Sequence, residues 1–237
     1  MYEQDLTDIK KLSIPKIIIL GLSPGLVIFL WAGFFAFGIN LSMNLSLVLA
    51  IILGLIPTEL GILKFIARKE NKKIRDLILF QNKTPMKYFV FSIIITLIIA
   101  GITIFLLSPY EMKLWQILGF VSELENANLQ EIDYLKITLV LFFIFNGLLG
   151  PIVEEIYFRG YLLPRMGVFG KFAPLINMII FSIYHFFSPL QNISRIIGFT
   201  PMVYAVWINK DIKIGIIVHC LINIIGNVIM FMTLLAV

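Results

Sequence analysis

Long apolar runs recur along the chain, separated by short polar segments. A transmembrane helix needs about 20 mostly apolar residues to cross about 30 Å of hydrocarbon, and seven runs approach that length. They are Lys16–Ile39, Leu41–Leu63, Tyr88–Ser108, Lys136–Leu163, Phe172–Ser188, Ile196–Ile208 and Ile212–Leu235. The pattern predicts an all-α fold, a polytopic helical membrane bundle with about seven transmembrane helices.

Two of these runs are less regular than the others. The sixth is short and is interrupted by Pro201. The first is too long and begins too far into the chain for a secretory signal peptide, and it lacks a small-residue cleavage site, so we expect a retained span. No internal repeat, low-complexity tract or block of charge marks a second unit. Residues 1–237 are therefore predicted to form a single membrane domain.

The amino-acid composition requires a lipid environment. Of the 237 residues, 59% are hydrophobic and only 14% are charged, with a mean hydropathy of +0.97. An ordinary soluble domain is about 45–50% apolar even when glycine is counted, so a compact soluble fold of this length is excluded. The single cysteine, Cys220, excludes a disulfide framework.

Basic residues cluster between particular spans. The insertion machinery retains Lys and Arg on the cytoplasmic side, and an N-terminus inside the cell places 16 of the 19 basic residues there. The exceptions are Lys113, Lys136 and Arg195, and the predicted outer loop from Ser108 to Tyr134 is acidic. The predicted topology is N-in and C-out. The net charge of +5 then indicates contact with anionic lipid headgroups, and no nucleic-acid partner is expected.

Two connections are long enough to contain helices that lie in the membrane interface. Lys72–Phe80 mixes basic and apolar residues, and Leu114–Val121 carries Trp115 and Phe120. Aromatic and apolar residues beside polar ones suit a helix at headgroup level. An ordered surface connection is the alternative for both.

Few ionisable side chains lie within the predicted spans. A charge at the bilayer centre costs about 2.5–3.5 kcal/mol even on the lenient insertion scale, so such residues are expected to be functional or paired. Together with one amide, they are Glu59, Glu154, Glu155, Arg159, His185, His219 and Asn223. Both histidines of the chain belong to this set.

The two adjacent glutamates are expected to differ in role. Glu155 and Arg159 are four residues apart and share a helix face, close enough for an ion pair that lowers the burial cost of both. Glu154 is rotated by about 100° and lacks that partner. An unpaired carboxylate in such a site is suited to act as a general base. Glu155 is therefore predicted to be structural and Glu154 chemical.

The histidines lie on two further spans. Phe181 and His185 are spaced i, i+4, as are His219 and Asn223, so each pair shares a helix face. A lone histidine on an apolar helix is usually a structural hydrogen-bonding residue, but residues of this kind on three spans indicate one shared polar site. At 1.5 Å per residue, Glu154 and His219 lie about 14 Å from the inner ends of their spans and His185 about 21 Å. A site in the inner half of the membrane, open toward the cytoplasm, is expected.

These residues form three short motifs in a fixed order on successive helices. The motifs are Glu154-Glu155-x-x-x-Arg159, Phe181-x-x-x-His185 and His219-x-x-x-Asn223. In this order they resemble the motifs of the CAAX-protease and bacteriocin-processing family of intramembrane endopeptidases. The resemblance covers residues 136–235, the predicted catalytic core, and nothing specific supports it in the first 130 residues.

The resemblance implies a role for each motif residue. Glu154 would activate a water together with His185, while His219 and Asn223 would stabilise the tetrahedral oxyanion. Glu155 and Arg159, with Phe181, would hold the shape of the site. Glu154, His185 and His219 are also a plausible zinc ligand set, and the sequence does not decide between zinc and a glutamate-activated water. Eukaryotic family members are usually assigned eight spans, so eight is the alternative to seven.

Other signals favour different interpretations less strongly. The segment Gly21–Gly25 matches the G-x-S-x-G pattern of serine hydrolases, but it lies inside an apolar helix and not in a strand–turn–helix. Glu59 either approaches the site or, near the inner end of its span, snorkels or pairs locally with Lys64. The rival classes are a non-catalytic immunity or regulatory protein and a transporter, although the inverted repeats typical of transporters are not found.

The expected substrates follow from the family. They are a lipidated protein, such as the C-terminal tail of a prenylated protein, or a small peptide such as a bacteriocin or signal precursor. A short chain without organelle signals is expected in a bacterial plasma membrane.

Overall fold

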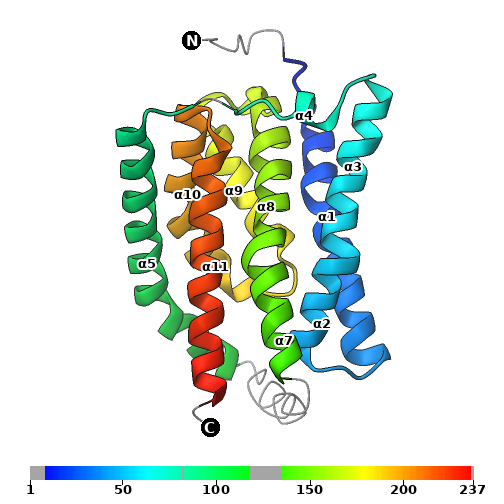
Figure 1. Ribbon diagram of the computed structural model, residues 1–237, viewed down its shortest axis with the longest axis vertical. Coiled ribbons are helices and arrows are strands. Elements are labelled where there is room, and N and C mark those ends of the chain that lie inside the picture. Colours follow the sequence, from blue (N-terminus) through cyan, green and yellow to red (C-terminus); the bar gives the residue numbers. More distant parts are fainter. Residues whose placement is uncertain (1–8, 82, 118–134, 236–237) are drawn as a thin grey trace.

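The computed structural model describes residues 9–81, 83–117 and 135–235 (Figure 1). Within these ranges the regular elements are helices, and they pack side by side as one bundle. α1 begins and α11 ends at opposite ends of this bundle (Figure 1). The predicted all-α membrane bundle is confirmed.

The first two predicted spans are helices that change their hydrogen-bonding pattern along their length. α1 (Ile14–Gly33) continues as a π-helical stretch, Phe34–Gly38. The second helix consists of α2 (Met43–Ala50), a π-helical stretch (Ile51–Leu55) and α3 (Ile56–Lys69). It runs further than predicted because its last turns extend past the apolar run into charged residues.

The predicted fourth span, which carries the adjacent glutamates, is one long helix with two π-helical stretches. It runs through α7 (Leu135–Leu141), Phe142–Leu149, α8 (Gly150–Glu155) and Ile156–Leu162, and it closes in a 3-10 turn, Leu163–Arg165. This final turn contains Pro164, which directly follows the predicted end of the span at Leu163.

Two of the π-helical stretches lie just before prolines, Pro57 in α3 and Pro151 in α8. Proline has no N–H, and its ring crowds the carbonyl four residues earlier. Widening the preceding turn to the i→i+5 pattern relieves that conflict. Within one turn of each proline the chain places a buried glutamate, Glu59 or Glu154. The two prolines thus shape both helices where they carry acids.

The remaining helices complete the bundle. α5 extends beyond its predicted end, continuing through Pro109 into the predicted outer loop. The other helical bounds are α4 (Ile74–Leu77), α5 (Met86–Ile117), 3-10 turns at Gly167–Phe172 and Pro189–Gln191, α9 (Ala173–Tyr184), α10 (Asn192–Asn209) and α11 (Ile212–Leu235). α11 has the bounds predicted for the seventh span.

The predicted fifth span, Phe172–Ser188, is wrong at its C-terminal end. α9 ends at Tyr184, and the backbone of His185 has left the helix, with φ −81° and ψ 61°. In a continuing helix the Phe181 carbonyl would accept the His185 backbone N–H. Here it accepts the Nδ1–H of the His185 ring at 2.8 Å instead. The chain then turns back within the height of the bundle and enters α10 (Figure 1).

By length and composition, six helices of the described residues are suited to cross a membrane. They are Ile14–Gly38, Met43–Lys69, Met86–Leu114, Ile137–Arg165, Gly167–Tyr184 and Ile212–Met232. The predicted sixth span is a continuous helix through Pro201, α10, but it is not among the six. Its polar residues, such as Asn192 and Arg195, lower its hydropathy. The count of seven spans stays a prediction.

The two predicted interfacial segments have different outcomes. Lys72–Phe80 contains only the short α4, and Leu77 and Phe80 are buried against the bundle, so it is an ordered connection. Leu114–Val121 begins as the last turn of α5 up to Ile117, and its remainder lies outside the described residues.

The segment with the G-x-S-x-G pattern lies within α1, as expected. A Cβ built on Gly21 would overlap Ile180, and one built on Gly25 would overlap the backbone oxygen of Tyr184. These glycines therefore allow α1 to approach α9 closely, and they form no hydrolase turn.

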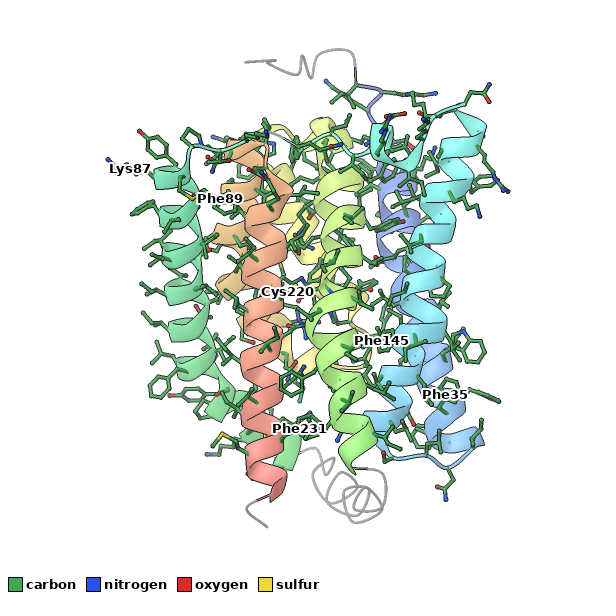
Figure 2. The ribbon with its side chains drawn as sticks, viewed as in Figure 1. Phe35, Lys87, Phe89, Phe145, Cys220 and Phe231 are labelled. Atoms are coloured by element: carbon green, nitrogen blue, oxygen red, sulfur yellow. The ribbon has the colours of Figure 1, made fainter. Side chains whose placement is uncertain are left out.

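Apolar side chains cover the outer faces as well as the interior (Figure 2). Tyr157 and Phe158 are 0% exposed, whereas Phe37 is 85% and Phe105 is 78% exposed. Phe231 lies near the C-terminal end of α11 (Figure 2). Its ring packs edge-on against that of Phe142, with ring centroids 6.1 Å apart. Large exposed aromatic and aliphatic side chains on outer helix faces suit contact with lipid.

The segments predicted to be cytoplasmic meet at one end of the bundle. The Leu12 N–H donates to the Arg165 carbonyl at 3.0 Å, and the Ile212 N–H donates to the Phe80 carbonyl at 3.0 Å. This gathering is what the predicted topology requires, although the N-in orientation itself stays a prediction.

Candidate active site

Glu154 and Glu155 end α8 and lie between its two flanking π-helical stretches. Their side chains are only 5% and 0% exposed. Because successive helical residues differ by about 100°, the two carboxylates face different neighbours.

Glu155 lies in a charge-balanced group that we call the Arg159 cluster, formed by Glu155, Arg159, Met178 and Phe181. Arg159 Nη1 is 3.2 Å from Glu155 Oε1, with both side chains 0% exposed, so the predicted i, i+4 ion pair is present. The guanidinium carbon lies 4.1 Å from the centre of the Phe181 ring. Phe181 therefore contributes a cation–π contact to this pair.

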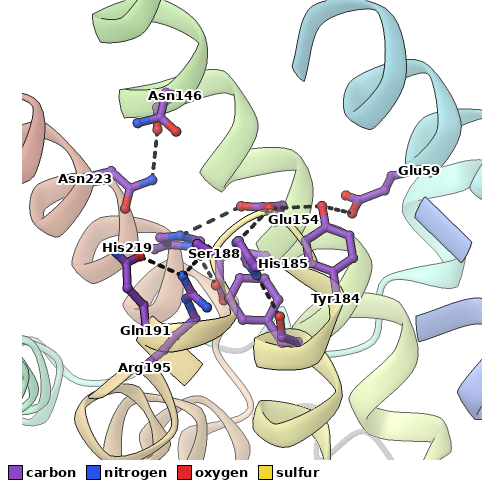
Figure 3. Close-up of polar contacts among 12 residues, drawn as sticks. Glu59, Asn146, Glu154, Tyr184, His185, Ser188, Gln191, Arg195, His219 and Asn223 are labelled. Atoms are coloured by element: carbon purple, nitrogen blue, oxygen red, sulfur yellow. Dashed lines mark hydrogen bonds and ion pairs between the residues drawn. The ribbon is translucent and has the colours of Figure 1, made fainter. Parts of the chain in front are cut away.

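His219 on α11 joins the Arg159 cluster to Glu154. Its Nδ1 hydrogen-bonds to Glu155 Oε1 at 3.0 Å. Its Nε2 lies 3.8 Å from Glu154 Oε2 (Figure 3). Glu155 is paired with Arg159 as a carboxylate, and a carboxylate only accepts hydrogen bonds. We therefore assign a hydrogen to His219 Nδ1, which donates it to Glu155. The histidine ring is thereby oriented with Nε2 toward Glu154.

His185 reaches the same glutamate from the end of α9. Its Nδ1–H is held by the Phe181 carbonyl, and its Nε2 lies 3.9 Å from Glu154 Oε1. The i, i+4 relation between Phe181 and His185 therefore operates through the backbone carbonyl, not through a shared helix face. Glu154 thus lies between the Nε2 atoms of both histidines (Figure 3).

Asn223 lies one helical turn after His219, as predicted, but its resolved contact is with another helix. Its amide donates to the backbone carbonyl of Asn146 at 2.9 Å (Figure 3). The Asn146 amide in turn donates to Asn227 Oδ1 at 2.9 Å. This arrangement fixes the Asn223 side chain on the face of α11 next to the long helix.

Tyr184 is not part of the three motifs and was not predicted as a site residue, yet it is buried at the centre of the site. Its hydroxyl is 3.0 Å from Glu154 Oε1 and 3.2 Å from Glu59 Oε1 (Figure 3). We call Glu59, Glu154, Tyr184 and His185 the Tyr184 cluster. Of the two expectations for Glu59, the approach to the site is therefore the one that the structure bears out. A hydroxyl in an apolar helix, directly before His185, was the available signal.

Arg195 was predicted to lie on the outer side of the membrane, and in the structure it forms hydrogen bonds with nearby residues. Its guanidinium donates to Ser188 Oγ at 2.8 Å and to Gln191 Oε1 at 3.1 Å (Figure 3). Both partners belong to the connection that follows His185. Arg195 thereby secures this connection to the first turn of α10.

The predicted zinc ligands can be compared with zinc geometry. Two ligands of a tetrahedral zinc at about 2.0–2.1 Å lie about 3.3–3.4 Å apart, whereas the Glu154 oxygens are 3.9 Å from His185 and 3.8 Å from His219. Among the described residues, no group of three or more His, Cys, Asp or Glu side chains is placed to hold a metal ion. These side chains would have to move closer together to hold zinc, so zinc stays a prediction, and no chemical step below is routed through a metal.

A buried carboxylate flanked by two imidazoles, on helices of a membrane bundle, defines the class of site found in hydrolases that activate water. Comparison with known families agrees. Residues 136–225 match the family described as Rce1-like, type II CAAX prenyl endopeptidases. This segment is therefore similar to the CAAX-protease family that the three motifs resemble. No curated protein and no solved structure matches the chain.

Proposed function

We propose that this chain is an intramembrane endopeptidase that hydrolyses peptide bonds near the cytoplasmic membrane face, with Glu154 as the base that activates water. One observation carries the proposal. The Glu154 carboxylate, 5% exposed, lies 3.9 Å and 3.8 Å from the Nε2 atoms of two histidines, within the segment that matches the CAAX endopeptidases.

The first step is the attack of water on the scissile carbonyl carbon. The distances of 3.8–3.9 Å between the Glu154 oxygens and the histidine Nε2 atoms are too long for a direct hydrogen bond. A water molecule can instead form hydrogen bonds to both atoms of such a pair. Glu154 takes one proton from that water as the carbon–oxygen bond forms. His185 Nε2 accepts a hydrogen bond from the other hydrogen of the water, which stays on its oxygen, because His185 Nδ1 carries the hydrogen that is bonded to the Phe181 carbonyl.

The second requirement is stabilisation of the oxyanion. Glu155 holds the His219 ring at Nδ1, and the ring faces Glu154 with Nε2. In this proposal an N–H at His219 Nε2 and the second amide hydrogen of Asn223 are the donors for the developing charge. The carbon–nitrogen bond then breaks, and the leaving amine takes the proton that Glu154 received.

The Arg159 cluster holds the donors in place. Glu155 fixes the His219 ring, and Arg159 balances the charge of Glu155 inside the bundle. A preorganised donor costs no reorganisation during the reaction. Glu155, Arg159 and Phe181 are therefore positioning residues.

The substrate class and location follow from the family and the charge pattern. The substrate is the C-terminal tail of a lipidated protein or a small peptide precursor, reached from the cytoplasmic side of a bacterial plasma membrane. The basic segments at one end of the bundle bind anionic headgroups there.

The test compares wild type with Glu154→Ala in the same host. Membrane-associated and secreted peptides are measured by mass spectrometry, and Glu70→Ala serves as the matched control because Glu70 is exposed at the end of α3. We expect at least one peptide whose cleavage requires Glu154 and is unchanged in the control. If the peptides of all three strains agree while an immunity or regulatory phenotype survives Glu154→Ala, the chain is a non-catalytic binder and the proposal fails.

Zinc is the alternative chemistry for the same three side chains, Glu154, His185 and His219. Bound there, a zinc ion would polarise the carbonyl and the water. Metal analysis of the purified protein, with a chelator control on activity, separates the two. Stoichiometric zinc together with loss of activity in chelator would replace the metal-free scheme.

A further inference from the structure

Glu59 belongs to the site although it lies outside the segment that matches the protease family. It is in the first turn of α3 and is 0% exposed. Its carboxyl lies 3.2 Å from the Tyr184 hydroxyl, which lies 3.0 Å from Glu154 Oε1 (Figure 3). One hydroxyl therefore bridges two carboxyl groups that come from separate parts of the chain.

The number of hydrogens in this bridge limits its arrangement. A tyrosine hydroxyl has one hydrogen to donate and lone pairs to accept. It donates to one of the two carboxyl groups, so the other must donate to it. An ionised carboxylate is only an acceptor, and one of the two glutamates must therefore carry a proton.

The surroundings assign that proton to Glu59. Its second oxygen, Oε2, is buried and has no hydrogen-bond partner among the described residues, and an unpaired oxygen costs a charged carboxylate more than a neutral carboxyl. Glu154 instead faces two imidazole rings at 3.8–3.9 Å. The charge therefore lies on Glu154, and Glu59 donates to the tyrosine oxygen.

We propose that Glu59 is a positioning residue for the base: as a neutral acid it fixes the Tyr184 hydroxyl so that its hydrogen points to Glu154 Oε1. That bond occupies one lone pair of Oε1 and fixes the orientation of the Glu154 carboxylate, whose remaining lone pairs are left for the water. The inference rests on the proposed function, since it assigns Glu59 to the same reaction.

The neighbouring backbone supports a fixed bridge. The π-helical stretch Ile51–Leu55, just before Pro57, sets the direction from which Glu59 approaches Tyr184. On the other side, Gly25 of α1 lies against the backbone of Tyr184, where any side chain would overlap. The Tyr184 ring stacks on Phe181, with centroids 5.7 Å apart. Besides the hydrogen bonds of its hydroxyl, Tyr184 is thus held by α1 at its backbone and by Phe181 at its ring.

The activity test uses a double-mutant cycle on the Glu154-dependent cleavage defined above. Glu59→Gln keeps an N–H donor for the tyrosine oxygen and should cleave within about threefold of wild type. Glu59→Ala and Tyr184→Phe should each lower cleavage about tenfold to hundredfold, as expected for a hydrogen bond to a charged group. In the Tyr184→Phe background, Glu59→Ala should add little, because Glu59 acts through that hydroxyl.

Tyr157→Phe is the matched control for loss of a buried tyrosine hydroxyl. Its hydroxyl donates to the Leu20 carbonyl at 2.8 Å, and this variant should keep wild-type cleavage. Full additivity of Glu59→Ala and Tyr184→Phe, or a Glu59→Gln variant as slow as Glu59→Ala, would overturn the inference while leaving the Glu154 proposal intact. Loss of all Glu154-dependent cleavage differences would instead remove the proposed function.

A spectroscopic measurement tests the protonated acid without any substrate. The infrared difference between wild type and Glu59→Gln should show loss of a protonated carboxyl band, and that between wild type and Glu154→Gln should show loss of a carboxylate band. The reverse assignment would place the proton on Glu154 and contradict the inference.

Discussion

Glu155 and Glu154 are neighbours in the chain, and they take part in clusters of opposite character. The Arg159 cluster contains a cation 3.2 Å from its acid and is closed from solvent. The Tyr184 cluster joins two acids through one hydroxyl, contains His185 and lies beside His219, but its members include no Lys or Arg. The difference shows that one helix can carry two kinds of buried acid at adjacent positions. Glu155 is neutralised by Arg159 and maintains the shape of the site, whereas Glu154 has no basic partner in its cluster and is available for chemistry.

The largest expected effect breaks the neutralised pair. Glu155→Gln leaves Arg159 charged without a partner, and removal of one member of a buried pair costs about 3–5 kcal/mol. Glu154→Gln removes no such partner and should cost less than about 1 kcal/mol. Accumulation in membranes and thermal unfolding in detergent measure both. Equal accumulation of the two variants would contradict the division of roles between the clusters.

The next effect concerns the chemical side of the comparison. Asn223→Ala should lower cleavage about 10²–10³-fold, as for loss of one oxyanion donor, with little change in accumulation. Asn209→Ala is the control, because that amide bonds only within its own helix to Ala205 among its resolved contacts. A loss of folded protein that matches the loss of cleavage would make Asn223 structural.

A smaller effect tests how closely the Arg159 cluster is packed. A Cβ on Gly215 would overlap Glu155 Oε2, whereas one on Gly226 of the same helix meets nothing within 4 Å. Overpacking typically costs about 1–3 kcal/mol, so Gly215→Ala should unfold at a lower temperature. Gly226→Ala should be neutral or slightly stabilising. Indistinguishable melting curves would mean that the cluster has room to move.

The smallest effect comes from an exposed ion pair, which serves as the reference for the buried one. Lys72 lies 2.9 Å from Glu70, and its hydrogen bond lowers the pKa of Glu70. A lowered carboxyl pKa adds stability above its ordinary value that disappears as the pH falls through the folded value. Lys72→Ala should therefore cost about 0–1 kcal/mol at neutral pH and nothing in acid. Thermal unfolding at both pH values checks the sign, and a larger cost in acid would contradict it.

Helical periodicity and the cost of buried charge were sufficient to predict much of this molecule. They located the helices, the Glu155–Arg159 pair and the two histidines that face Glu154. Periodicity failed at His185, because a side-chain nitrogen takes a backbone acceptor there and ends α9. A regular repeat contains no information about such a competition.

Long-range partners were the other gap. Tyr184 and Glu59 are 125 positions apart. The packing of α1 against α9 and of α3 against α8 brings them together. The sequence marked Glu59 as an unusual buried acid but offered two neighbours for it. The prolines of these helices were a further signal in the sequence, because Glu59 and Glu154 each lie within one turn after a proline that follows a π-helical stretch.

The i, i+4 spacing of Glu155 and Arg159 also bears on how the protein is made. A helix that enters the membrane during synthesis does so before later helices exist, and an isolated charge opposes that entry. This helix carries its own counter-ion, four residues away and 3.2 Å apart in the folded chain. His219 is synthesised 64 positions after Glu155, so the long helix is insertion-competent without it, and only the chemistry of the site has to wait for α11.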